Sequence, residues 1–180
     1  MDNLRRLEGL IEKVELFARL PKPCLQSVSP KALVEKSVSA YSQQAEIQGI
    51  QLTADLQEAS LFLDKAFLSR AMSILIENAM DAINGSGEIT VRGMRQDNEY
   101  RIVTRDTGCG ISPKDVPRIF DPFFRTKADG VGIDLTVLKR VVESQGGVID
   151  VESQPGKGTT FTLRFPIERR RSVRTCRFRN

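Results

Sequence analysis

Apolar residues in the first 20 positions recur at alternating spacings of three and four. This spacing predicts an amphipathic helix with one apolar stripe, the pattern of a coiled coil or a helical bundle. The stripe consists of Leu4, Leu7, Ile11, Val14 and Ala18. Pro21 and Pro23 end the helix. The stripe either pairs with a second copy of the chain or with a helix outside it, or it folds onto the segments that follow.

Three later segments also have the apolar spacing of helices. Ser29-Pro30 predicts a capped start for the first of them, and Asp64 predicts the cap of the second. A short helix is also expected near 114–119, within a stretch rich in glycine and proline. The three main helices are expected over residues 30–49, 65–83 and 133–145.

Five segments alternate between apolar and polar residues, as strands with one buried face do. They cover residues 50–56, 88–93, 99–105, 148–153 and 159–166. The second and third predict a β-hairpin. Helices and strands in this order predict a two-layer α/β (α+β) sandwich, in which one mixed β-sheet is covered by helices on one face.

Positive charge is concentrated at the end of the chain. The net charge is +4, but residues 168–180 contain six arginines and one glutamate, which leaves −1 for residues 1–167. A folded part so close to neutral does not favour nucleic acid as a partner. The tail is expected to be disordered, with a contact to an anionic surface as the alternative. The expected organisation is a helix over 1–20, a linker over 21–28, one domain over 29–167 and the tail.

The chain contains no histidine. This excludes Ser-His-Asp and Cys-His catalysis and makes most zinc sites impossible. No stretch approaches the about 18 apolar residues that a membrane-spanning helix needs. A cytoplasmic location is expected, with membrane attachment only through a region outside this chain.

Candidate chemistry lies in four short motifs, each a weak signal by itself. They occupy the end of the long helix, the turn after a strand, the glycine- and proline-rich stretch, and the start of the last helix. In order, they are Glu77-Asn78-Ala79-Met80-Asp81-Ala82, Asp106-Thr107-Gly108-Cys109-Gly110-Ile111, Ile119-Phe120-Asp121-Pro122-Phe123-Phe124-Arg125-Thr126-Lys127 and Gly130-Val131-Gly132-Ile133-Asp134-Leu135. The turn Gly156-Lys157-Gly158-Thr159-Thr160-Phe161 follows them.

In this order and spacing, the motifs resemble the N, G1, F and G2 boxes of the GHKL (Bergerat-fold) ATPases, most of all the catalytic domain of sensor histidine kinases. The resemblance covers about residues 29–166. The segment that ends Glu15-Leu16-Phe17-Ala18-Arg19 resembles the second helix of a kinase dimerisation domain.

The residue types suit the binding of ATP with Mg²⁺. The carboxylate of Asp106 can accept a hydrogen bond from the adenine amine, and charge-assisted bonds of this kind contribute about 1.5–3 kcal/mol. Gly108 and Gly110 are expected to let the backbone approach the base closely. The side-chain oxygen of Asn78 is a hard ligand suited to Mg²⁺. Gly130 precedes a helix start, where outward-pointing amides favour anions.

The resemblance implies a wider set of site residues. Glu77 and Asn78 are the expected catalytic pair, in which Glu77 positions or polarises an incoming imidazole; a solvated carboxylate is the alternative for Glu77. The expected nucleotide ligands are Asn78, Asp81, Asp106, Gly108, Gly110, Ile111, Lys127, Gly130, Val131, Gly132, Leu135 and Thr159, with Asn78 also the metal ligand.

Two positions depart from the family pattern. Asp134 replaces the third glycine of the fourth motif, and it places negative charge near the expected phosphates. Ile74 stands where a helix-facing asparagine is common in these kinases. Both departures bear on activity more than on fold.

The expected function is the catalytic domain of a two-component sensor histidine kinase, which transfers the γ-phosphoryl group of Mg-ATP to a histidine outside this chain. The implied partners are ATP, the dimerisation helix of the parent kinase, a response regulator and a second copy of the chain through residues 4–18. Two alternatives remain. One is an impaired nucleotide-binding or docking module of the same fold, which Asp134 favours. The other is a serine kinase of the anti-sigma type.

Overall fold

The computed structural model describes residue 15 and residues 18–125 and 132–167. These residues contain three α-helices, a short 3-10 helix and seven strands, and the three helices and the five predicted strands follow the expected order. The helices are α2 (Pro30–Ile47), α3 (Lys65–Ala82) and α4 (Asp134–Ser144), and η1 (Val116–Arg118) is the 3-10 helix. The strands are β1 (Gln26–Val28), β2 (Ile50–Leu56), β3 (Leu61–Leu63), β4 (Gly87–Gln96), β5 (Glu99–Asp106), β6 (Val148–Gln154) and β7 (Gly158–Pro166).

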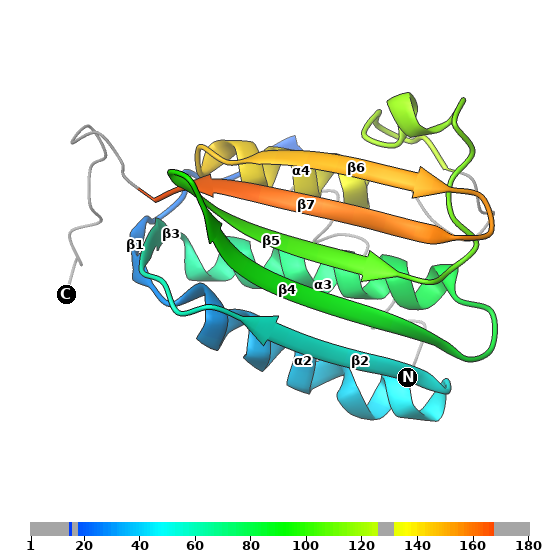
Figure 1. Ribbon diagram of the computed structural model, residues 1–180. Helices are drawn as coiled ribbons and strands as arrows, with labels where there is room; N and C mark the ends of the chain where they lie inside the picture. Colours follow the sequence, from blue (N-terminus) through cyan, green and yellow to red (C-terminus); the bar gives the residue numbers. More distant parts are fainter. Residues whose placement is uncertain (1–14, 16–17, 126–131, 168–180) are drawn as a thin grey trace, which may run out of the picture.

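The main sheet has five strands in the order β2-β4-β5-β7-β6. β2 is parallel to β4, while the other neighbouring pairs are antiparallel. The three α-helices lie behind this sheet in Figure 1, and no helix of the described residues covers its other face. The predicted two-layer sandwich with one mixed sheet is therefore confirmed.

The predicted helix caps are present. The Oγ atom of Ser29 accepts a hydrogen bond from the amide of Ala32 at 3.2 Å, and Pro30 is the first residue of α2. Oδ1 of Asp64 accepts from the amides of Ala66 and Phe67 at 2.9 and 3.1 Å. Such caps satisfy amides that would otherwise have no partner inside the helix.

A small second sheet was not predicted. β1 pairs antiparallel with β3, although residues 26–28 read as part of a linker in the sequence. The carboxylate of Asp64 also accepts from the amide of Cys24 at 2.6 Å, and the amide of Asp64 donates to Oε1 of Gln145 at 2.7 Å. These bonds hold the segment that enters the domain against α3 and α4.

Most of the predicted N-terminal helix and the whole basic tail lie outside the described residues. Glu15 and Ala18 are helical, and the amide of Arg19 donates to the carbonyl of Glu15 at 2.8 Å. Among the described residues, no helix has the length and apolar character needed to cross a membrane.

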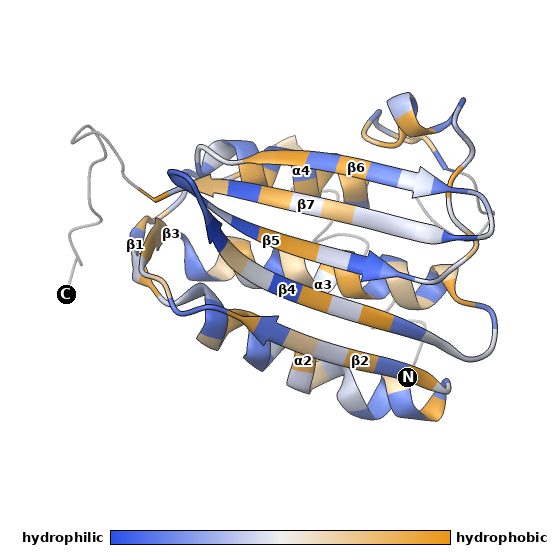
Figure 2. Cartoon of the chain, viewed as in Figure 1, coloured by the Kyte–Doolittle hydropathy of each residue, from blue (hydrophilic) through white to orange (hydrophobic). Residues whose placement is uncertain are grey.

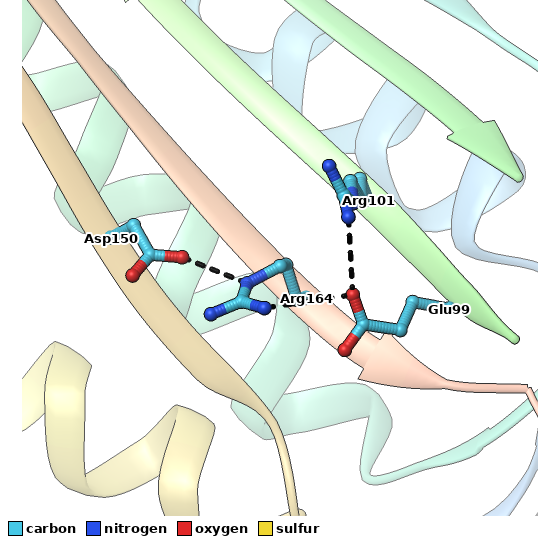
Figure 3. Close-up of polar contacts among 4 residues, drawn as sticks. All are labelled: Glu99, Arg101, Asp150 and Arg164. Carbon is cyan, nitrogen blue, oxygen red and sulfur yellow. Dashed lines mark hydrogen bonds and ion pairs between the residues drawn. The ribbon is translucent and has the colours of Figure 1, made fainter. Parts of the chain in front are cut away.

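The two faces of the sheet differ in character. Along each strand, apolar and polar residues alternate (Figure 2), and the apolar ones pack against the helices. On the helix-free face, Glu99 lies between Arg101 and Arg164, which face each other across β5 and β7 (Figure 3). Glu99 is within 3.5 Å of Arg101 and 3.7 Å of Arg164, and Asp150 is within 2.8 Å of Arg164. The acids offset the repulsion of two like charges placed opposite one another.

Thr104 is a buried polar residue on the helix-covered face of β5. Its side chain is 2% exposed, and its Oγ1 atom has no hydrogen-bond partner among the described residues. A buried hydroxyl without a partner is destabilising by about 1–3 kcal/mol.

We therefore expect Thr104→Val to raise the melting temperature by about 2–4 °C, as judged from the usual scaling for a domain of this size. The matched control is Thr136→Val, because the buried Thr136 hydroxyl donates to the carbonyl of Phe120 at 3.0 Å. That control should lower the melting temperature. Thermal melts of both variants against the parent check the prediction, and a destabilised Thr104→Val would contradict it.

Candidate functional site

Asp106 ends the central strand β5, and its carboxylate is the most buried acidic group of the candidate site. The residue is 4% exposed. Its Oδ1 atom accepts from the amide of Gly108 at 2.8 Å and from the amide of Thr159, on β7, at 3.2 Å. Because a buried carboxylate is costly unless it is hydrogen-bonded, these two amides fix its place and orientation.

The glycines after Asp106 serve the packing of the protein itself. A Cβ atom at Gly108 would lie 2.6 Å from the carbonyl oxygen of Ala82, at the end of α3, and one at Gly110 would overlap the carbonyl oxygen of Gln154. Gly110 also has a positive φ of 69°. The protein's own packing therefore already requires glycine at both positions, and the expectation that they let the backbone approach the base stays a prediction. The loop is wedged between α3 and the β6–β7 turn, and a side chain at either position would collide with backbone.

A chain of hydroxyl groups lines the same side of the loop. Oγ of Ser153 accepts from the amide of Ile111 at 2.8 Å and donates to the carbonyl of Gly158 at 3.0 Å. It also lies 3.0 Å from Oγ1 of Thr159. Since the single proton of Ser153 is used on a carbonyl, Thr159 must donate in this contact. The lone pairs of the buried Thr159 hydroxyl then remain as acceptors beside Asp106.

The last turns of α3 carry the first motif. The amide nitrogen of Asn78 donates to the carbonyl of Ile74 at 2.8 Å, which fixes the amide plane and leaves its oxygen as the group suited to a metal. Glu77 is exposed, and Oε1 accepts from the hydroxyl of Tyr41 at 2.6 Å. Asp81 is also exposed. Ile74 is buried in the core, so its side chain makes no polar contribution to the site.

The segment that leads into α4 carries the last motif of the candidate site. The N-cap position is Ile133, which provides no side-chain cap, and Asp134 is the first helical residue. Gly132 has a φ of 74°, and its carbonyl accepts from the amide of Phe123 at 2.8 Å. Leu135 is partly buried against the core. Lys127, Gly130 and Val131 lie outside the described residues.

The described groups fit a nucleotide. Asp106 and Thr159 present acceptors at the end of β5, suited to the amine of adenine, and Asn78 presents a hard oxygen from α3. The amides at the start of α4 have no side-chain cap and favour an anion, although Asp134 adds negative charge there.

The comparison with known families decides the assignment. Residues 63–169 match the family described as histidine kinase-, DNA gyrase B- and HSP90-like ATPases. The chain belongs to this ATPase family. Members of this family bind ATP, and the predicted resemblance is confirmed.

Relatives of this ATPase include sensor histidine kinases. ZraS of Escherichia coli (strain K12) is 35% identical over 164 residues, which make up 90% of this chain and 35% of ZraS. The chain therefore spans about a third of the length of this relative. It carries the catalytic ATPase domain found in sensor histidine kinases.

Solved structures agree with this assignment. Full-length ShkA in complex with AMPPNP has a TM-score of 0.82 at 26% identity, over 89% of this chain and 36% of ShkA. The mycobacterial sensor histidine kinase MprB has a TM-score of 0.71 at 25% identity, over 79% of this chain and 97% of the MprB chain.

Three contributors to the ATPase site were missed in the sequence. The hydroxyl of Ser153 and the carbonyl of Ala82 shape the loop after Asp106, and Tyr41 bonds Glu77. A backbone carbonyl has no sequence signal. Ser153 lies six residues before Thr159, and on its own it reads as an ordinary polar strand residue.

Gly158 and Gly156 provide a test of the packing around Asp106. Both have a positive φ, of 91° and 73°, but a Cβ atom at Gly158 would lie within van der Waals overlap of the Asp106 carbonyl, whereas one at Gly156 would meet nothing within 4 Å. Gly156→Ala should therefore cost only the left-handed strain of about 1–2 kcal/mol.

Gly158→Ala should cost about 3 kcal/mol or more of unfolding free energy, and it should also weaken nucleotide binding. Urea unfolding and calorimetric ATP titration check both effects. Equal losses of stability in the two variants would show that the contact with Asp106 is relieved at little cost.

Proposed function

We propose that this domain binds Mg-ATP at the Asp106–Thr159 end of the sheet and transfers the γ-phosphoryl group to a histidine on a dimerisation domain. The observation that carries the proposal is the buried Asp106 carboxylate, which is fixed by two backbone amides beside an acceptor hydroxyl. The chain contains no histidine, so the acceptor lies on another polypeptide or in another part of the parent protein.

Each group has a distinct role in this proposal. Asp106 and Thr159 recognise the adenine, and the loop of Gly108, Gly110 and Ile111 holds them in place. Asn78 would hold Mg²⁺ through its side-chain oxygen. The metal supplies positive charge that offsets the charge of the phosphate oxygens.

The remaining proposed ligands complete the site. Gly132 precedes α4 and Leu135 lies in its first turn, where we place the phosphates. Gly130, Val131 and Lys127 lie outside the described residues and remain proposed phosphate ligands, with Lys127 offering positive charge. Asp81 follows Asn78 on α3. Glu77 acts on the imidazole that receives the phosphoryl group. Positioning and charge stabilisation suffice for phosphoryl transfer, which makes few covalent demands on the protein.

The proposed partners follow from the same assignment. They are the dimerisation helix of the parent kinase, a response regulator and a second copy of the chain through residues 4–18. The proposed location is the cytoplasm, with membrane attachment only through a sensor region outside this chain. The relatives support these proposals because they are sensor kinases, and they give no support to the anti-sigma alternative.

Asp134 favours a second candidate, a domain of the same fold with weakened nucleotide binding. Its carboxylate starts α4, at the place where phosphates are expected. In this reading the domain acts mainly by docking to partner helices.

Calorimetric titration with ATP, ADP and adenosine tests the proposed site. Asp106→Ala should lower the affinity for all three ligands by about 10- to 100-fold, because each loses the same charge-assisted hydrogen bond. Asn78→Ala should lower the affinity for ATP by about tenfold, and only when Mg²⁺ is present. The affinity for ADP should fall less.

The controls are Asp55→Ala, on the exposed edge of the sheet, and Asn98→Ala, in the hairpin at the far end of β5. Neither control should change affinity. Asp106→Asn provides a variant that keeps an acceptor oxygen for the two backbone amides. Parent-like binding of every ligand by both site variants would show that the nucleotide binds elsewhere.

A second titration addresses Asp134. At about 6 Å, a carboxylate repels one phosphate charge by about 2–3 kcal/mol at an effective dielectric of about 20, and screening reduces this. Asp134→Gly should therefore bind ATP about tenfold more tightly, with a smaller gain for ADP. The fold should lose roughly 1–2 kcal/mol, since the helix start loses a favourable charge and gains a glycine.

Asp134→Asn is the matched control for this change. It removes the charge and keeps the backbone preference, so it should tighten ATP binding without the full loss of stability. Unchanged or weaker ATP affinity in both variants would mean that the carboxylate points away from the phosphates.

A further inference from the structure

Tyr41 connects α2 to the residue proposed to act on the acceptor histidine. α2 packs beside α3 (Figure 1). The side chain of Tyr41, on α2, is partly buried against the core. Its hydroxyl donates to Oε1 of Glu77 at 2.6 Å, across 36 positions of sequence. Both tyrosines of the chain make a hydroxyl bond of 2.6 Å, since the buried Tyr100 donates to the carbonyl of Gln57.

The groups around the Tyr41 hydroxyl favour its protonated form, in which it can donate a hydrogen bond. Burial raises the pKa of Tyr41, and the hydrogen bond and negative charge of Glu77 raise it further. Ser73 and Arg70, which face the hydroxyl from the preceding turns of α3, act in the opposite direction, but the balance remains upward. The pKa of Tyr41 is therefore raised from its ordinary value, mainly by burial, and the hydroxyl keeps its proton.

This bond restricts a side chain that would otherwise move freely. Glu77 is exposed, and a glutamate on an open helix face samples several rotamers, whose loss costs up to about 1.5–2 kcal/mol. Within the described part of the chain, the hydroxyl of Tyr41 is the hydrogen-bond partner of the Glu77 side chain, and it donates to Oε1. The second oxygen can then accept from a group that approaches from solvent.

We propose that Tyr41 is a positioning residue, whose hydroxyl holds Glu77 in the orientation that accepts a hydrogen bond from the incoming imidazole. This inference rests on the proposed function. In the transfer step, the lone pair of one imidazole nitrogen forms a bond to the γ-phosphorus. The bond from that phosphorus to the β–γ bridging oxygen breaks, and ADP leaves with its electron pair. The ring becomes positively charged, and its other N–H donates to Glu77 before it loses the proton to solvent.

The test uses the chain of 180 residues with Mg-ATP, and its acceptor probe is a purified helical hairpin that carries one exposed histidine. Rates of phosphohistidine formation are measured for the parent, Tyr41→Phe, Glu77→Gln and the double variant. Tyr100→Phe is the matched control, because it removes an equally short hydroxyl bond at a distance from Glu77. ATP affinity is measured in parallel for every protein.

Tyr41→Phe should lower kcat by about tenfold, while the KM and the Kd for ATP stay unchanged. The double variant should be no slower than Glu77→Gln, because the hydroxyl acts only through that carboxylate. Tyr100→Phe should transfer at the parent rate.

Parent-like transfer by Tyr41→Phe, with Glu77→Gln slow, would overturn the positioning role and leave the proposed function intact. Multiplicative losses in the double variant, or an equal loss in Tyr100→Phe, would also overturn it, since they indicate an effect on the fold. A parent protein that binds Mg-ATP but does not phosphorylate the probe would count against the proposed function, and against the inference with it.

Discussion

The candidate site depends on the two hydrogen bonds that hold the Asp106 carboxylate. A carboxylate that is 4% exposed must be compensated, and the compensation comes from the amides of Gly108 and Thr159. One amide belongs to the loop after β5 and the other to the start of β7. The carboxylate can therefore stay in place only when β5 and β7 are paired and the loop turns back at Gly108. The geometry of the site therefore depends directly on the pairing of β5 with β7.

The loop after Asp106 extends this constraint to the neighbouring elements. Gly108 lies against the end of α3, and Gly110 lies against the β6–β7 turn. The amide of Cys109 donates to the carbonyl of Ala82 at 2.9 Å, and the carbonyl of Cys109 accepts from the amide of Gly156 at 2.8 Å. Backbone groups at the end of α3 and in the β6–β7 turn thus fix the loop. In such a site the glycines are required by the protein's own packing before any ligand is considered.

Much of this fold could be predicted from the sequence because its signals are local. Alternation located the five strands of the main sheet, and the caps at Ser29 and Asp64 located two helix starts. β1 and β3 were missed because three residues are too few to show a period. Candidate site residues could be recognised from their motifs, but the packing contacts that require glycine at positions 108 and 110 could not. Their neighbours, the carbonyls of Ala82 and Gln154, come close only after α3 and the β6–β7 turn have packed. The bond from Tyr41 to Glu77 depends likewise on how two helices pack, which residue spacing along one helix does not specify.

Consecutive residues of α3 serve two different neighbours. Successive side chains of a helix point about 100° apart, so Asn78 and Glu77 leave the helix in different directions. Asn78 bonds back to the carbonyl of Ile74 and directs its oxygen outward, whereas Glu77 meets the hydroxyl of Tyr41 from α2. The proposed metal ligand is therefore oriented by α3 itself, while the acid beside it is oriented by a neighbouring helix. A displacement of α2 relative to α3 would disturb the acid and leave the metal ligand and the Asp106 end of the sheet unchanged. Under the proposed function, metal binding and phosphoryl transfer could then respond separately to changes in helix packing, although Asn78 and Glu77 lie in one turn of one helix.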